Sequence, residues 1–492
     1  MSAAPFDATN PDAHAGGQSL GATPADGTAT TSSPAPAIDT LGALRASGHV
    51  AKSLREEIRD NLLAALADGR DPWPGLHGFD DTVLPQLERA LIAGHDVVLL
   101  GERGQGKTRL LRTLVGLLDE WTPVIAGSEL GEHPYEPITH ASQRRVAELG
   151  DALPVAWRHR DDRYGEKLAT PDTSVADLIG DVDPIKVAQG RTLGDPETIH
   201  YGLIPRSHRG IGAVNELPDL AERIQVAMLN VMEERDIQIR GYTLRLPLDV
   251  LVVASANPED YTNRGRIITP LKDRFGAQIR THYPVALADE VAVIAQEAQL
   301  VARVPDTLVE IIARFTRALR ESPSIDQRSG VSARFSIAGV ETVAAAARHR
   351  AARRHEVHAV ARVVDLAAAA QVLRGKVEFE SGEEAREQEV LDYLLRTATA
   401  ATVREHLAGV DLGPIVSMIE DGALITTGEQ VSAREFLDGL PRIARPTYHE
   451  IATRLHAQDD GERAAAIELA LEGLYLARRI SKDVDGDRTV YG

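Results

Sequence analysis

A short apolar run, a glycine-rich loop and a helix follow one another between residues 96 and 118, and this order constrains the fold more than any other feature. The run Asp96-Val97-Val98-Leu99-Leu100 predicts a buried parallel strand. Residues 101–108 then fit the pattern G-x-x-x-x-G-K-T, and residues 109–118 predict a helix. This pattern binds phosphate when it lies between a strand and a helix. The sequence therefore predicts a nucleotide-binding α/β domain.

The loop residues supply what a bound phosphate group requires. Glycines let consecutive backbone N–H groups converge on phosphate oxygens, and a helix N-terminus adds positive potential. Lys107 is placed to reach the β- and γ-phosphates, and the Thr108 hydroxyl is placed to hold Mg²⁺. The alternative is a glycine-rich turn that carries Lys-Thr by chance. We expect ATP and Mg²⁺ as ligands, with the nucleotide held by Gly101, Glu102, Arg103, Gly104, Gln105, Gly106, Lys107 and Thr108.

A second predicted strand, residues 210–214, runs into Asn215-Glu216. A carboxylate at a strand tip near the phosphates can polarise the attacking water, so we predict this role for Glu216. Asn215 would hold a water of the Mg²⁺ shell through its carbonyl oxygen, without the negative charge that an aspartate would bring. The alternative is that both residues only begin the helix predicted over residues 218–234.

A third predicted strand, residues 250–254, continues into Ser255-Ala256-Asn257-Pro258. A polar side chain at this tip can orient water or contact the γ-phosphate, and Asn257 is the candidate. The alternative is an ordinary turn residue before proline. Strands that alternate with helices predict a parallel sheet.

The chain divides by composition into five segments. Residues 1–38 are rich in Ala, Pro, Thr, Ser, Gly and Asp and predict a disordered tail. Residues 39–74 predict an N-terminal helical segment, 75–285 the α/β nucleotide-binding domain, 286–375 an all-α lid and 376–492 a C-terminal helical region.

Charge and composition exclude several classes of protein. The formal net charge of −19 makes nucleic acid an unfavoured partner. The absence of cysteine excludes disulfides and thiolate metal sites. No apolar run reaches the length of a membrane span, and no signal peptide is visible at the N-terminus. A cytoplasmic protein is the default expectation.

These motifs in this order resemble the AAA+ ATPases, in particular the branch of the MoxR proteins and the magnesium-chelatase ATPase subunit. The resemblance covers residues 75–375. Residues 178–184, with Gly202-Leu203-Ile204-Pro205 and Arg209-Gly210-Ile211, look like the insertion within helix 2 that defines this branch. Residues 233–241 look like the hairpin before sensor 1, with Gly241 placed for the turn.

The resemblance also implies two arginines of the site. Asp273-Arg274-Phe275 looks like the D-R-F motif, whose arginine acts on ATP bound by the neighbouring subunit; the alternative for Arg274 is a surface pair with Asp273. Arg334 resembles the second sensor arginine on the lid. Asn215 departs from the usual aspartate, which puts metal affinity or hydrolysis rate in doubt. No mechanism follows for the charged segment 129–170.

Two further features, a basic stretch and a C-terminal helix, are interpreted as structural and not as binding sites. The basic stretch 348–358 on a predicted helix favours a solvated helix face over a polyanion site. His355 and His358 within it lack an obvious third metal ligand. The helix expected over residues 464–481 favours core or subunit packing.

The resemblance implies a ring, expected to be a homo-hexamer, because an arginine acts across subunits. It also implies a protein client that is remodelled or matured by metal or cofactor insertion, and a von Willebrand-type partner; this chain has no D-x-S-x-S motif. The first alternative is the motor of a magnesium chelatase acting on a porphyrin. The second is a nucleic-acid motor or transcription activator, which the net charge disfavours.

Overall fold

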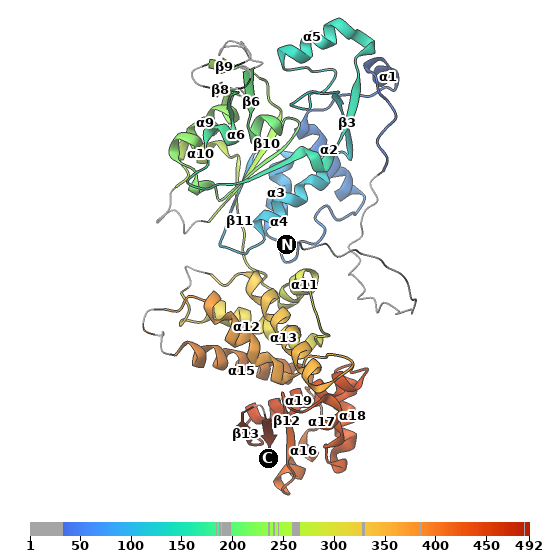
Figure 1. The fold of residues 1–492 in the computed structure, drawn as a ribbon, viewed down its shortest axis with the longest axis vertical. Helices are drawn as coiled ribbons and strands as arrows, with labels where there is room; N and C mark the ends of the chain where they lie inside the picture. The colour runs from blue at the N-terminus through green and yellow to red at the C-terminus, as the bar shows by residue number, and fades with distance from the viewer. Residues whose placement is uncertain are drawn as a thin grey trace, which may run out of the picture.

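A computed structural model describes most of the 492-residue chain as an α/β half and a mainly helical half, stacked end to end (Figure 1). The described residues are 33–183, 185, 188, 198–234, 237–239, 242–244, 246–257, 266–326, 330–380, 382, 386–486 and 488–492. Most of the expected tail, residues 1–32, lies outside them.

The α/β half is built on a five-stranded parallel sheet. Its strands, in spatial order, are β11 (Ala277–Arg280), β1 (Val97–Leu100), β10 (Val250–Ala256), β7 (Gly210–Asn215) and β4 (Tyr164–Leu168). Every residue of β1, β7 and β10 is buried, which explains their continuous apolar sequence. The predicted fold class, a P-loop AAA+ sheet with flanking helices and a helical lid, is confirmed.

The edge strands β4 and β11 were not predicted. Their sequences, Tyr-Gly-Glu-Lys-Leu and Ala-Gln-Ile-Arg, carry polar residues because, among the described residues, each strand has a neighbour on one side only. Alternate residues of β1 and β10 enter two different cores on opposite faces of the sheet. One core is completed by α9 (Glu222–Glu234) and α10 (Thr269–Arg274), and the other by α2 (Leu54–Ala67), α3 (Val83–Ile92) and α4 (Lys107–Thr113).

Each of the two segments where the resemblance places an insertion contains an antiparallel strand pair. In the helix-2 insertion, α6 (Val175–Leu178) and α8 (Leu203–Arg206) flank an antiparallel pair, β5 (Gly180–Val182) and β6 (Ile199–Tyr201). The hairpin before sensor 1 consists of β8 (Ile237–Ile239) and β9 (Tyr242–Leu244). Residues 184, 235, 236, 240 and 241, which belong to these motifs, lie outside the described residues.

Residues 121–159, which include most of the charged segment, pack with residues 33–46 as a small unit. It contains α1 (Leu41–Ala46), β2 (Trp121–Ile125), α5 (His140–Leu149) and β3 (Val155–His159), with β2 and β3 antiparallel. The indole of Trp121 donates to the Ser33 carbonyl at 2.9 Å, and that of Trp157 to the Ile38 carbonyl at 2.7 Å. Residues 33–38, assigned from composition to the disordered tail, are thus held by hydrogen bonds that composition does not reveal.

The lid and the C-terminal region share one hydrophobic core, so no break in packing marks the expected boundary at 375/376. The lid helices are α11 (Leu287–Glu297), α12 (Asp306–Glu321), α13 (Ala333–Arg354) and α14 (Leu366–Leu373). The C-terminal helices are α15 (Glu387–His406), α16 (Gly413–Glu420), α17 (Ala433–Asp438), α18 (Arg445–Arg454) and α19 (Asp460–Leu476). Short 3-10 helices span Leu114–Leu117, Gly150–Ala152, Arg160–Arg163, Leu217–Asp219, Val363–Asp365, Arg374–Lys376 and Arg442–Ala444.

The region expected to be helical also contains a three-stranded antiparallel sheet. Its order is β12 (Ile425–Gly428), β14 (Arg488–Tyr491) and β13 (Lys482–Asp485). Strands of four residues give too little alternation to be recognised in the sequence. Most of α19 is buried, which confirms its assignment to the core.

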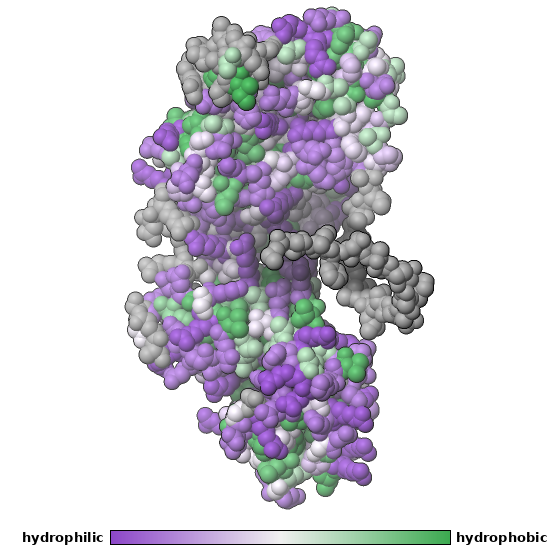
Figure 2. Space-filling model, viewed as in Figure 1, coloured by the Kyte–Doolittle hydropathy of each residue, from purple (hydrophilic) through white to green (hydrophobic). Residues whose placement is uncertain are grey.

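The basic stretch on α13 is not uniformly solvated. Arg350 is buried and pairs with Asp365 at 3.0 Å and Glu356 at 2.9 Å, so its guanidinium ties α13 to the following loop. The prediction of a solvated face was wrong for this residue. The face of the molecule in Figure 2 is mainly hydrophilic, with apolar side chains in small scattered groups. No helix of the described residues is both long and apolar enough to cross a membrane.

Candidate functional site

The glycine loop joins the end of β1 to the start of α4 at the edge of the sheet where β7 and β10 also end. Gly104 and Gly106 both have φ of +74°, a conformation that glycine adopts without steric cost. A Cβ on Gly101 would clash with Thr281 of β11's continuation, and one on Gly104 would clash with Ser332 before α13. The loop thus forms a tight backbone cradle closed by the lid, as phosphate binding requires.

Lys107 is 6% exposed and folds back on the loop. Its Nζ donates to the carbonyl oxygens of Gly101 at 2.6 Å and Glu102 at 2.7 Å. The ammonium group is therefore inside the cradle, where it can exchange carbonyl oxygens for phosphate oxygens. Thr108 is the next residue of α4. The backbone cradle, the lysine and the hydroxyl fit ATP and Mg²⁺, so these are the ligands that the described residues can hold.

The parallel pairing brings the other predicted residues to the same edge. Leu100 lies opposite Ala256, and Ala254 opposite Val214, so the loop, Asn257 and Asn215-Glu216 follow three adjacent strands. Asn215 and Asn257 are 5% and 4% exposed, whereas Glu216 is half-buried. Carboxyl ends of adjacent parallel strands are where α/β sheets bind ligands.

Glu216 has a left-handed backbone conformation, with φ of 54° and ψ of 48°. This region is uncommon for a residue other than glycine. The Glu216 N–H donates to Ser255 Oγ at 3.3 Å, which stabilises the turn. Sequence reasoning missed Ser255, because a single serine at the end of an apolar strand gives no signal of its own.

Asn215 lies in a hydrogen-bonded chain that crosses three strands. Its Nδ2 donates to Glu166 Oε1 at 2.7 Å, and its Oδ1 accepts from Ser255 Oγ at 3.0 Å. Glu166, on β4, also accepts two bonds from Arg112 on α4, at 2.8 and 3.0 Å. These bonds raise the pKa of the Arg112 guanidinium, because they favour its charged form. Glu166 and Arg112 were also missed, since β4 was not recognised as a strand.

The two predicted arginines occupy different places. Arg334 is exposed at the start of α13, two residues after Ser332, so the lid brings it near the glycine loop. Arg274 ends α10 and forms an ion pair with Glu233 of α9 rather than with Asp273. Its side chain is 43% exposed.

A cluster at the hinge connects the loop to the lid. The Tyr283 hydroxyl donates to the Arg103 carbonyl at 2.8 Å, and the Arg320 guanidinium stacks on the Tyr283 ring at 4.1 Å. Arg320 also forms a two-bond ion pair with the fully buried Glu290 and donates to the Val331 carbonyl. Tyr283 and Arg320 gave no signal in the sequence, yet they join the glycine loop to the segment that carries Arg334.

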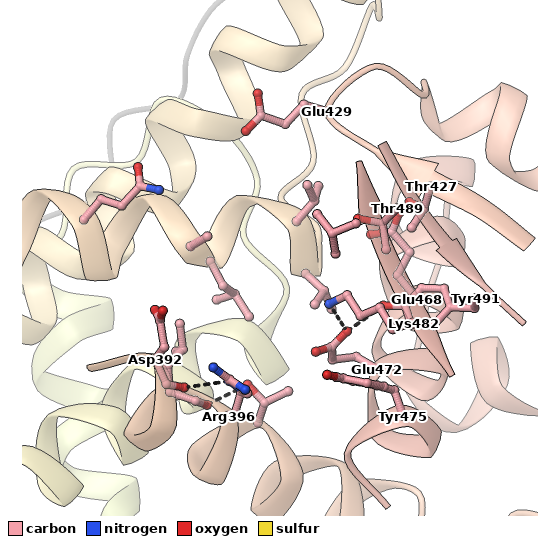
Figure 3. A pocket seen from close by; sticks show the side chains of 18 of the residues that line it. Asp392, Arg396, Thr427, Glu429, Glu468, Glu472, Tyr475, Lys482, Thr489 and Tyr491 are labelled. Atoms are coloured by element: carbon pink, nitrogen blue, oxygen red, sulfur yellow. Dashed lines mark hydrogen bonds and ion pairs between the residues drawn. The ribbon is translucent and has the colours of Figure 1, made fainter. Parts of the chain in front are cut away.

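A separate cavity of about 540 Å³ lies between α14 and α15 on one side and α19 with the C-terminal sheet on the other (Figure 3). Lys482 Nζ and the Tyr491 hydroxyl both donate to Glu472, at 2.7 and 2.5 Å. Beside them, Glu468 is buried and its pKa is raised by that burial. None of the residues predicted from sequence lines this cavity. Among the described residues, no group of three or more His, Asp or Glu side chains is arranged to hold a metal ion.

The fold and the strand-end site are those of a phosphate-binding-loop nucleotide site on a parallel α/β sheet. The chain is 26% identical to the magnesium-chelatase subunit ChlI of Anabaena variabilis over 207 residues, 41% of this chain and 57% of that protein. It is 28% identical to the chloroplastic subunit ChlI-1 of Arabidopsis thaliana over 219 residues, 43% of this chain and 48% of that protein. The resemblance to the magnesium-chelatase branch is therefore confirmed.

The similarity has limits. The chain spans about half the length of the curated relatives it matches. No family model matches it. Among solved structures, a chain of the magnesium-chelatase BchI–BchD complex is 19% identical over 65% of this chain and 98% of that chain, with a TM-score of 0.34.

Proposed function

We propose that the protein is an ATP-dependent motor that hydrolyses ATP and uses the energy to remodel a partner protein or to mature it by metal or cofactor insertion. The observation that carries the proposal is the meeting of the glycine loop, Glu216 and Asn257 at one edge of the sheet. Family resemblance supports the motor and the maturation of a client.

Each residue has a defined task in this proposal. The loop N–H groups and Lys107 bind the phosphates, and the Glu216 carboxylate accepts a proton from the attacking water. Asn257 orients that water. Bound Mg²⁺ neutralises charge on the phosphate oxygens, with Thr108 and Asn215 as the residues that would hold it. Arg334 and, from a neighbouring subunit, Arg274 stabilise the charge that spreads over the transferring oxygens.

The proposed assembly is a homo-oligomeric ring, for which the exposure of Arg274 is the supporting feature. Phosphate release would be measured for wild type, for Lys107→Ala, for Arg274→Ala and for a mixture of the two variants. Each variant alone is expected to be inactive. Recovery of activity in the mixture supports an arginine that acts across subunits; an inactive mixture contradicts it. Activity in Lys107→Ala would contradict the assignment of the glycine loop.

A magnesium chelatase that acts on a porphyrin is the second candidate, favoured by the names of the matched relatives. A pull-down with Glu216→Gln protein held in the ATP-bound state separates the two. Capture of a large porphyrin-binding subunit favours chelation. Capture of another client, with or without a von Willebrand-type partner, favours remodelling.

A further inference from the structure

From Glu216 through Ser255 and Asn215, every hydrogen bond donates toward Glu166, and Arg112 donates to Glu166 from the opposite side. Glu166 can only accept, so it fixes the donor end of the Asn215 amide toward itself. The acceptor end of that amide then faces Ser255, whose hydroxyl donates to it. The same hydroxyl oxygen accepts from the Glu216 N–H. A continuous series of hydrogen bonds therefore connects Glu166 to the backbone of the proposed general base.

The strand register places Glu166 beside residue 215. In the parallel β4–β7 pair, Glu166 lies opposite Ala213 and Leu168 lies opposite Asn215. Residues two apart on neighbouring strands point to the same face, so these side chains meet without any distortion. Arg112 comes from α4, directly after the glycine loop, and its two bonds to Glu166 fix the carboxylate from the other side.

We propose that Glu166 is a positioning residue for Glu216: the carboxylate usual at position 215 is supplied from the neighbouring strand, and Asn215 is its required neutral partner. Asn215 is then not a weakened aspartate. An aspartate there would place two carboxylates in contact with no proton between them, and their repulsion would displace the side chain at 215 and with it Ser255, which holds the Glu216 N–H. This inference rests on the ATP hydrolysis proposed above.

The test is to install the usual aspartate. Asn215→Asp is expected to lower kcat by about 10- to 100-fold, because Glu216 loses its fixed geometry. The KM for ATP should change little, since the glycine loop is untouched. The melting temperature without nucleotide should also fall. Adding Glu166→Gln to Asn215→Asp restores a donor opposite the new carboxylate and should recover both kcat and melting temperature.

A matched control is available in the C-terminal region. Gln388 Nε2 donates to Asp392 Oδ1 at 2.9 Å, so Gln388→Glu makes the same change from amide to carboxylate beside a carboxylate. It should leave kcat unchanged, because α15 carries no residue of the site. Glu166→Gln alone should lower kcat through the weakened bond to Arg112.

The outcomes separate the inference from the proposed function. If wild-type protein releases no phosphate, the ATPase proposal fails, and the melting temperatures still test the pairing. Wild-type activity together with Asn215→Asp that is as fast or faster overturns the inference. A double variant no better in kcat or melting temperature than Asn215→Asp also overturns it. If Asn215→Asp does not fold, folding of the double variant supports the inference, and failure of both contradicts it.

Discussion

The Glu166 carboxylate of the α/β domain and the Glu468 carboxylate of the C-terminal region differ in burial and in how completely they are hydrogen-bonded. At the strand ends, Glu166 is fully hydrogen-bonded and its chain of contacts leads outward to Glu216. In the C-terminal region, Arg362 and Glu468 lie 3.3 Å apart at 0% and 1% exposure. Within the described part of the chain, Arg362 Nε and Glu468 Oε2 find no hydrogen-bond partner. The hydrogen bonds of Glu166 can position a catalytic side chain, whereas the Arg362–Glu468 pair contributes to the packing of the C-terminal region.

This contrast predicts that changes in the first region alter rate and changes in the second alter stability. The largest effect is expected for Glu216→Gln. Loss of a general base should slow phosphate release by about 100- to 10,000-fold. Nucleotide binding, measured by titration with a fluorescent ATP analogue, should persist because Lys107 and the loop are intact. Unchanged phosphate release would remove Glu216 from the mechanism.

Arg362→Ala should reverse that pattern. Removing one member of a buried ion pair leaves the other uncompensated and should cost about 3–5 kcal/mol in the free energy of unfolding. Denaturant titration of the C-terminal region measures this, and nucleotide affinity of the folded protein should not change. Arg434→Ala is the control, because its ion pair with Asp438 is 89% and 77% exposed. The control should cost less than about 1 kcal/mol. Equal losses in the two variants would refute the contrast.

The stabilities of the two regions should also respond differently to acid. Burial lowers the pKa of His133 to about 3 and that of His208 to about 4, from 6.5. Below pH 6.5 the unfolded chain takes up protons that the folded α/β half does not, so its stability falls between pH 6.5 and pH 4. By pH 5 the loss should be about 2 kcal/mol for each imidazole.

The buried carboxyl of the C-terminal region titrates in the opposite sense. Burial raises the pKa of Glu468, so its contribution to stability is present at low pH and lost as pH rises through the folded-state pKa. Limited proteolysis at pH 7 and pH 5 should therefore show earlier opening of the α/β half in acid. Opening of both halves at the same pH would contradict this difference.

The smallest effect is expected at the junction between the α/β domain and the lid. Tyr283→Phe removes the hydrogen bond to the Arg103 carbonyl but keeps the ring under Arg320. Loss of one hydrogen bond should weaken ATP binding by about 2- to 10-fold. Tyr393→Phe removes a hydroxyl from a residue that is 67% exposed and should have no effect. Equal affinities in all three proteins would mean that Tyr283 does not couple the lid to the loop.

The sequence was sufficient for features that depend on local order. The loop and the strands β1, β7 and β10 were predicted because each combines a continuous apolar run with a polar tip. Glu166 could not be found in this way, because its role depends on the register between β4 and β7. The burial of Arg350 was missed for the same reason, since its partners Asp365 and Glu356 lie beyond the end of its helix.

The indole bonds of Trp121 and Trp157 to residues 33 and 38 have a practical consequence. The chain has three tryptophans, and the third is Trp73, whose Nε1 donates to Glu88 at 2.9 Å. All three precede the lid, so tryptophan fluorescence reports on the α/β half alone. Two of the three tryptophans, Trp121 and Trp157, contact residues 33–38. The unfolding of the α/β half can therefore be followed by tryptophan fluorescence without any added dye.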